Sequence, residues 1–235
     1  MNLRESAPED HFRKYQALRS DCAGRSARGS RILPASMRDH IRAALSNAAS
    51  HLETLARNEE ALLAIERAGA LLAASFEAGG RVFACGNGGS MCDAMHFAEE
   101  LSGKFRKERR PLAAVAISDP GHLTCASNDY GYEEAFARYI EAHGRAGDVL
   151  LSISTSGKSP NVVRAAERAR KLGLKVVALT GRPGSALGRV ADIEICTPAG
   201  EWSDRVQELQ IKVIHILVEL VERRLFPENY PSKTS

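Results

Sequence analysis

The chain has 235 residues, of which 44% are hydrophobic and 26% are charged, and its formal net charge is +3. This composition is typical of an ordinary globular protein, and so small a net charge gives no argument for a nucleic-acid partner. No uncharged apolar run approaches the roughly 18 residues of a membrane span. We therefore expect neither nucleic acid nor a membrane as a partner.

The cysteines are five in number, at Cys22, Cys85, Cys92, Cys125 and Cys196, and none forms a CxxC pair. An odd count without such pairs argues against a disulfide framework and against a structural zinc module. The N-terminus carries acidic residues and no apolar segment, so it does not resemble an export signal. We expect a reducing, cytoplasmic compartment.

Residues 1–36 are rich in Arg, Ser and Gly, as in CAGRSARGSR, and show little periodicity. We expect a disordered basic extension or an over-long reading frame. A basic arm for RNA or a targeting peptide is the alternative. Residues 37–226 are expected to form a single domain, followed by a short tail at 227–235.

Two helical patterns lie between residues 37 and 79, with apolar residues three or four apart, and AGG at 78–80 ends them. Strands and helices then alternate. The expected strands lie at 81–85, 113–117, 148–154, 175–180 and 192–196. The expected helices between them begin near 91 or lie around 133–143, 160–172 and 185–190, and a long amphipathic helix at about 202–225 ends the pattern.

Short, continuously apolar strands that alternate with helices indicate a parallel sheet buried on both faces. The predicted fold class is therefore α/β. It is a five-stranded parallel sheet with helices on both faces, a doubly wound three-layer sandwich. An N-terminal helical pair precedes the sheet, and the long C-terminal helix follows it.

Two turns rich in Gly and Ser follow expected strands, GNGGS at 86–90 and STSGKS at 154–159. Ligands of open parallel sheets bind outside the carboxyl ends of the strands. Each turn leads into a helix, whose unpaired amide groups and dipole favour an anion, and the hydroxyl groups add donors. The turns predict a phosphorylated small molecule as ligand.

Two nucleotide-binding motifs fail at these turns. Met91 stands where the dinucleotide fingerprint requires Gly or Ala, and Ser152 replaces the first glycine of a P-loop. Ser159 is expected to cap the helix that begins with Pro160. Capping accounts for one serine of the second turn and leaves its other hydroxyls for a ligand.

His96 and Glu100 are one helical turn apart, so both side chains can reach one metal ion or one substrate carbon. A surface ion pair is the common alternative for this spacing. His215 stands among apolar residues of the last helix, where a core histidine is the default interpretation. Gln207 precedes His215 by about 12 Å along the axis of the last helix, so the two residues can lie on either side of a site but cannot be adjacent ligands.

Four segments in this order resemble bacterial phosphoheptose isomerases, a family with the sugar isomerase (SIS) fold. They are GNGGSMCDAMHFAEELSG, AISDPGHLTCASNDYGY, GDVLLSISTSGKSPNV and DRVQELQIKVIHILVELVE. The resemblance covers about residues 37–226. It implies conversion of sedoheptulose 7-phosphate to D-glycero-D-manno-heptose 7-phosphate, the first step toward the nucleotide-activated heptose of lipopolysaccharide.

The resemblance also implies a homotetramer with active sites between subunits and one zinc ion per subunit. The implied metal ligands are His96, Glu100, Gln207 and His215. The implied contacts to the phosphorylated seven-carbon sugar are Asn87, Gly88, Gly89, Ser90, Glu100, Asn128, Asp129, Ser154, Thr155, Ser156, Ser159 and Gln207. Met91 and Gln210 stand where some members have histidine, and we expect these two departures to alter only the edge of the pocket.

Isomerisation of a ketose needs a base for a carbon-bound proton and an acid for the carbonyl oxygen. Glu100 is suited to be the base because a closed pocket raises the pKa of a carboxyl group. His215 is suited to be the acid, with apolar neighbours that exclude water. A tightly coordinated Glu100 would be a poorer base, and the sequence leaves that conflict open.

Three other functions fit part of this pattern. One is a non-enzymatic SIS protein, such as the initiator-associating protein of bacterial replication. Another is an isomerase with a different sugar phosphate, and the third is the sensor domain of a regulator. The presence of both Glu100 and His215 favours the heptose isomerase, because a binding protein gains nothing from two polar groups in apolar surroundings.

Overall fold

A computed structural model describes residues 36–231 of the chain. The expectation of a disordered extension falls on residues that lie outside this range, apart from Ser36. Of the described residues, 36–41 and 42–231 belong to two different units of the chain. In the first unit Ser36 and Asp39 form a reciprocal cap, in which each backbone amide donates to the other side chain.

Two helices open the described region. Helix α2 spans Met37–Ala56 and α3 spans Glu59–Glu77, as the apolar spacing predicts. The side chain of Asn58 accepts a hydrogen bond from the backbone of Ala61, which starts α3. No helix within residues 36–231 has the length and apolar character needed to cross a membrane.

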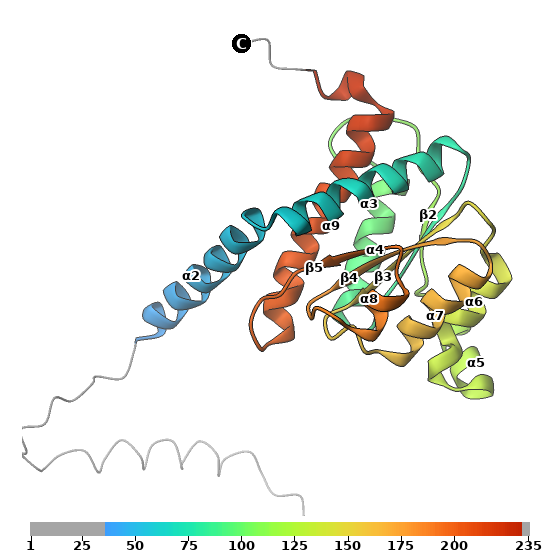
Figure 1. The fold of residues 1–235 in the computed structure, drawn as a ribbon, viewed down its shortest axis with the longest axis horizontal. Helices are drawn as coiled ribbons and strands as arrows, with labels where there is room; N and C mark the ends of the chain where they lie inside the picture. Colours follow the sequence, from blue (N-terminus) through green and yellow to red (C-terminus); the bar gives the residue numbers. More distant parts are fainter. Residues whose placement is uncertain (1–35, 232–235) are drawn as a thin grey trace, which may run out of the picture. The chain divides into compact units, whose positions relative to one another are not determined.

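The five expected strands form one parallel sheet (Figure 1). They are β1 (Val82–Cys85), β2 (Ala114–Ala116), β3 (Val149–Ser154), β4 (Lys175–Thr180) and β5 (Ile193–Cys196). Their order is β2-β1-β3-β4-β5. The chain therefore winds outward in both directions from the pair β1 and β3, which makes that pair the topological switch point of the sheet.

The expected crossover helices are also present. They are α4 (Gly89–Ser102), α6 (Ala135–His143), α7 (Pro160–Lys171), α8 (Ala186–Val190) and the long α9 (Ser203–Leu225). Two short 3-10 helices, η1 (Tyr132–Glu134) and η2 (Pro227–Asn229), are also present.

One helix, α5 (Pro120–Tyr130), does not appear among the expected elements. Asp119 caps it by accepting a hydrogen bond from the backbone of His122, and Pro120 occupies its first position. An Asp-Pro pair at a helix start is a recognisable signal. The helix was therefore predictable from its cap, although its apolar residues show only a weak helical spacing.

Alternate strand residues face opposite layers of helices. Ala84, Leu151 and Leu179 belong to the buried cluster that includes α3, α4 and α9. Phe83 and Leu150 belong to the cluster that includes α6, α7 and α8. Both faces of the sheet are thus covered, which confirms the three-layer α/β fold.

Helix α3 approaches α9 closely at one glycine. A Cβ atom at Gly69 would lie 2.8 Å from Cβ of Leu220. Alanine in a helix normally stabilises it by about 1 kcal/mol over glycine. Here we expect the reverse, with Gly69→Ala lowering the free energy of unfolding by about 1–3 kcal/mol, because the two helices must separate.

Urea unfolding monitored by circular dichroism measures this effect. Ala70→Gly is the control, since Ala70 is exposed on the same helix and reports the helix propensity alone. A Gly69→Ala protein more stable than wild type would show that the contact with Leu220 is not tight.

Candidate active site

The two Gly- and Ser-rich turns lie side by side, because β1 and β3 are hydrogen-bonded neighbours. The first turn leads into α4 and the second into α7. Gly88 has a φ of 56°, in the region that favours glycine. A Cβ atom at Gly86 would lie 2.7 Å from the carbonyl oxygen of Ser90, so only glycine permits this tight entry into α4.

Ser159 does not make the capping hydrogen bond that its position predicts. It precedes Pro160 at the start of α7, but its hydroxyl lies 3.1 Å from the hydroxyl of Ser154. The Ser156 hydroxyl accepts from the backbone of Lys158 at 3.2 Å. The serine hydroxyl groups therefore gather within the turn, where they can meet a ligand, instead of closing the helix end.

Asn87 is held by two residues that the sequence analysis did not single out. Its amide and that of Asn161, at the start of α7, exchange two hydrogen bonds of 2.9 and 2.8 Å. The hydroxyl of Tyr132 donates to the same Asn87 oxygen at 2.7 Å. These contacts fix the orientation of the Asn87 amide and leave one N–H free to donate to a ligand.

Asn128 and Asp129 lie on the unexpected helix α5 and are exposed. The amide of Asn128 donates to Asp129 at 2.8 Å, and the thiol of Cys125 lies 3.6 Å from the other Asp129 oxygen. Within the described part of the chain, these side-chain contacts stay inside α5 and do not reach the two turns. Thr155 is half-buried and Ser90 is buried beside their respective turns.

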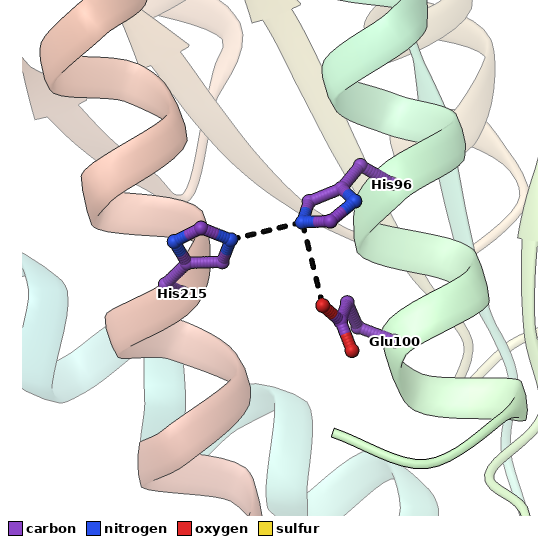
Figure 2. Close-up of side chains that lie close together, drawn as sticks. All are labelled: His96, Glu100 and His215. Atoms are coloured by element: carbon purple, nitrogen blue, oxygen red, sulfur yellow. Dashed lines mark hydrogen bonds and ion pairs between the residues drawn. The ribbon is translucent and has the colours of Figure 1, made fainter. Parts of the chain in front are cut away.

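Helices α4 and α9 bring His96, Glu100 and His215 together (Figure 2). The Nε2 atoms of the two histidines are 2.9 Å apart, and Nε2 of His96 lies 3.4 Å from Oε1 of Glu100. One ligand atom from each residue lies within 4.8 Å of the other two. Two imidazoles and a carboxylate at this separation form a donor set that fits a zinc-like metal ion.

Neighbouring groups orient this cluster. The Nδ1 atom of His96 pairs with Glu99 at 3.0 Å, so the two ring nitrogens of His96 face different partners. The ring of Phe105 lies 6.0 Å from that of His215. His215 is half-buried and faces the cluster from α9. The interpretation as a core residue therefore applies to the apolar residues around His215 and not to His215 itself.

Gln207 lies at the other end of the contact between α4 and α9. A Cβ atom at Gly89 would lie 2.5 Å from its amide nitrogen, so the side chain rests on the first residue of α4. The pairs Gly89 with Gln207 and His96 with His215 show that the helices run in the same direction. Gln207 therefore lies beside the first turn and apart from the histidine cluster.

Burial shifts the pKa values of the two groups that face each other across the site. The pKa of Glu100 is raised, first by burial and then by the neighbouring carboxylate of Glu99. The pKa of His215 is lowered, first by burial and then by His96. A carboxyl group of raised pKa and an imidazole of lowered pKa are suited to proton transfer.

The two departures from the family pattern, Met91 and Gln210, both pack against other parts of the fold. Gln210 is fully buried, and its amide donates to the carbonyl of Leu179 on β4 at 3.3 Å. Met91 packs against the apolar cluster on the opposite face of the sheet. Gln210 thus lies in the core beneath the apolar stripe of α9, and the effect of both departures on the edge of the pocket stays a prediction.

An apolar groove of about 360 Å³ adjoins His215. It lies between α2 and α9, and its lining includes Ala48, Ala49, Leu52, Leu209 and Ile211. One wall of the site is therefore hydrophobic and open in the single chain.

Comparison with known proteins gives the family. The SIS domain family matches residues 45–181. The phosphoheptose isomerase of Edwardsiella ictaluri is 54% identical over 187 residues, which are 80% of this chain and 97% of that protein. The chain therefore belongs to the SIS domain family, and its relatives at this level of identity are phosphoheptose isomerases.

Two solved structures agree with this assignment. The phosphoheptose isomerase from Francisella tularensis has a TM-score of 0.76 and 34% identity, over 80% of this chain and 100% of that one. The phosphoheptose isomerase from Neisseria gonorrhoeae has a TM-score of 0.74 and 34% identity, over 80% of this chain and 99% of that one. The likeness thus extends through the whole fold and is not confined to the turns.

Asp93, one turn before His96, gives a test of the electrostatics of α4. Burial raises the pKa of its carboxyl from 3.8 to about 6, and its Oδ2 atom is buried without a hydrogen-bond partner in the described region. The folded state binds the proton of the Asp93 carboxyl more tightly than the unfolded state does. Protonation of Asp93 therefore contributes its full stabilisation below pH 3.8, and this stabilisation is lost as pH rises through 6. Asp93→Asn should therefore gain stability relative to wild type between pH 4.5 and pH 7.

Urea unfolding of both proteins at several pH values, without added metal, measures this difference. Because the other titrating groups are shared, their contributions cancel in the comparison. A stability difference that stays constant from acidic to neutral pH would show that the Asp93 carboxyl is not perturbed.

Proposed function

We propose that this chain is an aldose-ketose isomerase that converts sedoheptulose 7-phosphate to D-glycero-D-manno-heptose 7-phosphate. The observation that carries the proposal is the cluster of His215, on α9, with His96 and Glu100, on a helix that begins at the turn expected to bind an anion. The relatives that share most of the chain are named for the same activity. We further propose that the product feeds the nucleotide-activated heptose of lipopolysaccharide.

In this mechanism Glu100 takes a proton from C1 of the ketose, and the electrons of that bond form the C1–C2 double bond of an enediol. The carbonyl oxygen at C2 accepts a proton from His215. Return of a proton to C2 and loss of one from the C1 oxygen complete the isomerisation. The raised pKa of Glu100 and the lowered pKa of His215 suit these transfers.

The phosphate is held by the two turns, away from this chemistry. We assign this contact to the hydroxyl groups of Ser90, Ser154, Thr155, Ser156 and Ser159. The backbone amides of Gly88 and Gly89 assist them at the start of α4. Asn87, with its remaining N–H, and Asn128, Asp129 and Gln207 are assigned to the sugar hydroxyls. Binding energy at the phosphate then positions C1 and C2.

We propose zinc as the metal, one ion per subunit, held by His96, Glu100 and His215. When bound, zinc would supply a Lewis acid that polarises the substrate carbonyl. Gln207 is proposed as the fourth ligand, which requires its amide to leave Gly89 and turn toward the cluster. The two imidazoles and the carboxylate already meet without such a movement.

We also propose a homotetramer with active sites between subunits and a cytoplasmic location. Apolar side chains on α2 and α3 are exposed, among them Leu45, Leu52, Leu62 and Leu63, and exposed apolar patches favour association. The apolar groove beside His215 supports an interface at the site itself. Free thiols at Cys85, Cys92, Cys125 and Cys196 support a reducing compartment.

A binding-only SIS protein and a regulatory sensor domain remain the competing functions. The turns would suit any sugar phosphate, so they do not separate these functions. The cluster of His96, Glu100 and His215 does separate them. A protein that only binds a sugar phosphate does not need a carboxyl group of raised pKa within 4.8 Å of two imidazoles.

Glu100→Gln and His215→Gln test the proposed acid and base. Each should lower kcat by about 100-fold or more, because general acid-base catalysis contributes factors of this size. Binding of sedoheptulose 7-phosphate should persist, since the phosphate turns are unchanged. NMR detection of the aldose phosphate, with and without a zinc chelator, measures conversion.

Glu66→Gln is the matched control, since it makes the same chemical change at an exposed position of α3. It should keep most of the activity. Near-normal turnover of Glu100→Gln would reject Glu100 as the base, and full activity in the chelator would reject the metal.

Ser156→Ala tests the phosphate contact. Loss of one hydroxyl donor should raise KM for the sugar phosphate about tenfold, as expected for a hydrogen bond to a charged group, and should change kcat less. Steady-state kinetics gives both constants, and Ser46→Ala, at an exposed position of α2, is the control. An unchanged KM would remove Ser156 from the phosphate site.

A further inference from the structure

Arg109 forms a fully buried ion pair with Glu222 of α9. Its side chain is 1% exposed and that of Glu222 is 0% exposed, and Nε of Arg109 lies 2.8 Å from Oε1 of Glu222. The hydroxyl of Tyr230 donates to the other carboxylate oxygen at 2.6 Å. Burial and the Glu222 carboxylate raise the pKa of Tyr230, so its hydroxyl remains a donor.

The remaining donors of Arg109 point at the end of α4. They reach the carbonyl oxygens of Glu100 at 2.7 Å, Leu101 at 2.9 Å and Gly103 at 2.7 Å. The last carbonyls of a helix have no partner within the helix, and a planar guanidinium can serve several of them at once. One of the carbonyls held in this way belongs to Glu100 itself.

The chain beyond α9 closes over this ion pair. The amide of Asn229 donates to the carbonyl of Glu108 at 3.1 Å, and the guanidinium groups of Arg109 and Arg110 lie 6.0 and 5.7 Å from the ring centre of Phe226. Residues 226–230 therefore take part in the fold and cover the segment that follows α4, although the sequence suggests only a tail from 227.

Stability alone is a weak reason for such an arrangement. A buried ion pair loses the hydration of both charges, and well-packed apolar residues often replace it without loss of stability. Its location suggests a different role, because it joins the last turn of α4 to α9. Those two helices carry Glu100 and His215, which must stay within a few ångströms of each other.

We propose that Arg109, Glu222 and Tyr230 are positioning residues, which hold Glu100 and the spacing of α4 and α9 at the separation that the active site requires. The proposal rests on the proposed isomerase function for its kinetic consequence. The contact geometry does not depend on that function. These residues touch neither the reacting atoms nor the phosphate turns, which lie at the start of α4.

Tyr230→Phe is the main test, because it leaves the ring in place and removes only the donor to Glu222. We expect kcat to fall about tenfold or more, since small displacements of catalytic groups have effects of this size. KM for sedoheptulose 7-phosphate should stay within about twofold, because the phosphate turns lie at the other end of α4. Partial unfolding would also lower the apparent kcat at unchanged KM, so circular dichroism measures the folded fraction and kcat is expressed per folded enzyme.

Arg224→Lys is the matched control, because Arg224 makes an exposed ion pair from the same helix to Glu77 of α3. It should leave kcat and KM unchanged. Glu222→Gln is a second test variant, which keeps the shape of the side chain and removes the charge. Arg109→Lys should behave like Arg109→Gln, since one ammonium group cannot reach three carbonyls and a carboxylate together.

The ring protons of His96 and His215 provide a readout without catalysis. Their NMR signals, assigned through His96→Gln and His215→Gln, should shift or broaden in Tyr230→Phe and in Glu222→Gln, and remain unchanged in Arg224→Lys. Folded Tyr230→Phe and Glu222→Gln proteins with wild-type kcat and wild-type histidine signals would overturn the proposal. If the wild type fails to isomerise the sugar, the histidine signals still decide the positioning role by themselves.

Discussion

The packing of α4 along α9 is the contact on which the site depends. His96 and His215 are 119 residues apart in sequence, yet their Nε2 atoms approach to 2.9 Å across this contact. Glycine at position 89 lets Gln207 lie directly on the first residue of α4. A change in the separation or rotation of the two helices would part the carboxylate from the imidazoles that face it.

The sheet adds a second constraint, because the order of its strands sets where α4 begins. β1 and β3 are neighbours at the switch point, so the turns that follow them meet, and Asn87 and Asn161 join them although 74 residues separate the two amides. Ser90 and His96 are about 9 Å apart along the axis of α4. One helix thus carries the proposed anion site at its start and the cluster of His96 and Glu100 farther along.

Polar contacts fix α4 near both ends, while its middle carries the functional groups. At its start, the Asn87 and Asn161 amides lock the entry turn. At its end, Arg109 holds three carbonyls and pairs with Glu222. Buried polar groups are costly unless they are hydrogen-bonded. The buried polar groups at both ends of α4 are hydrogen-bonded. This is consistent with contacts that fix the position of α4 and do not merely stabilise the helix.

The sequence by itself determined the class of fold, the five strands and the two turns, because apolar periodicity and glycine are local signals. It also determined which residue types could act, since His96 and Glu100 share a helix face. It missed α5. Only the tertiary structure decided that His215 faces His96, that Asn161 holds Asn87 and that Arg109 caps α4. These contacts join segments far apart in the chain, and no local pattern specifies how two helices rotate against each other.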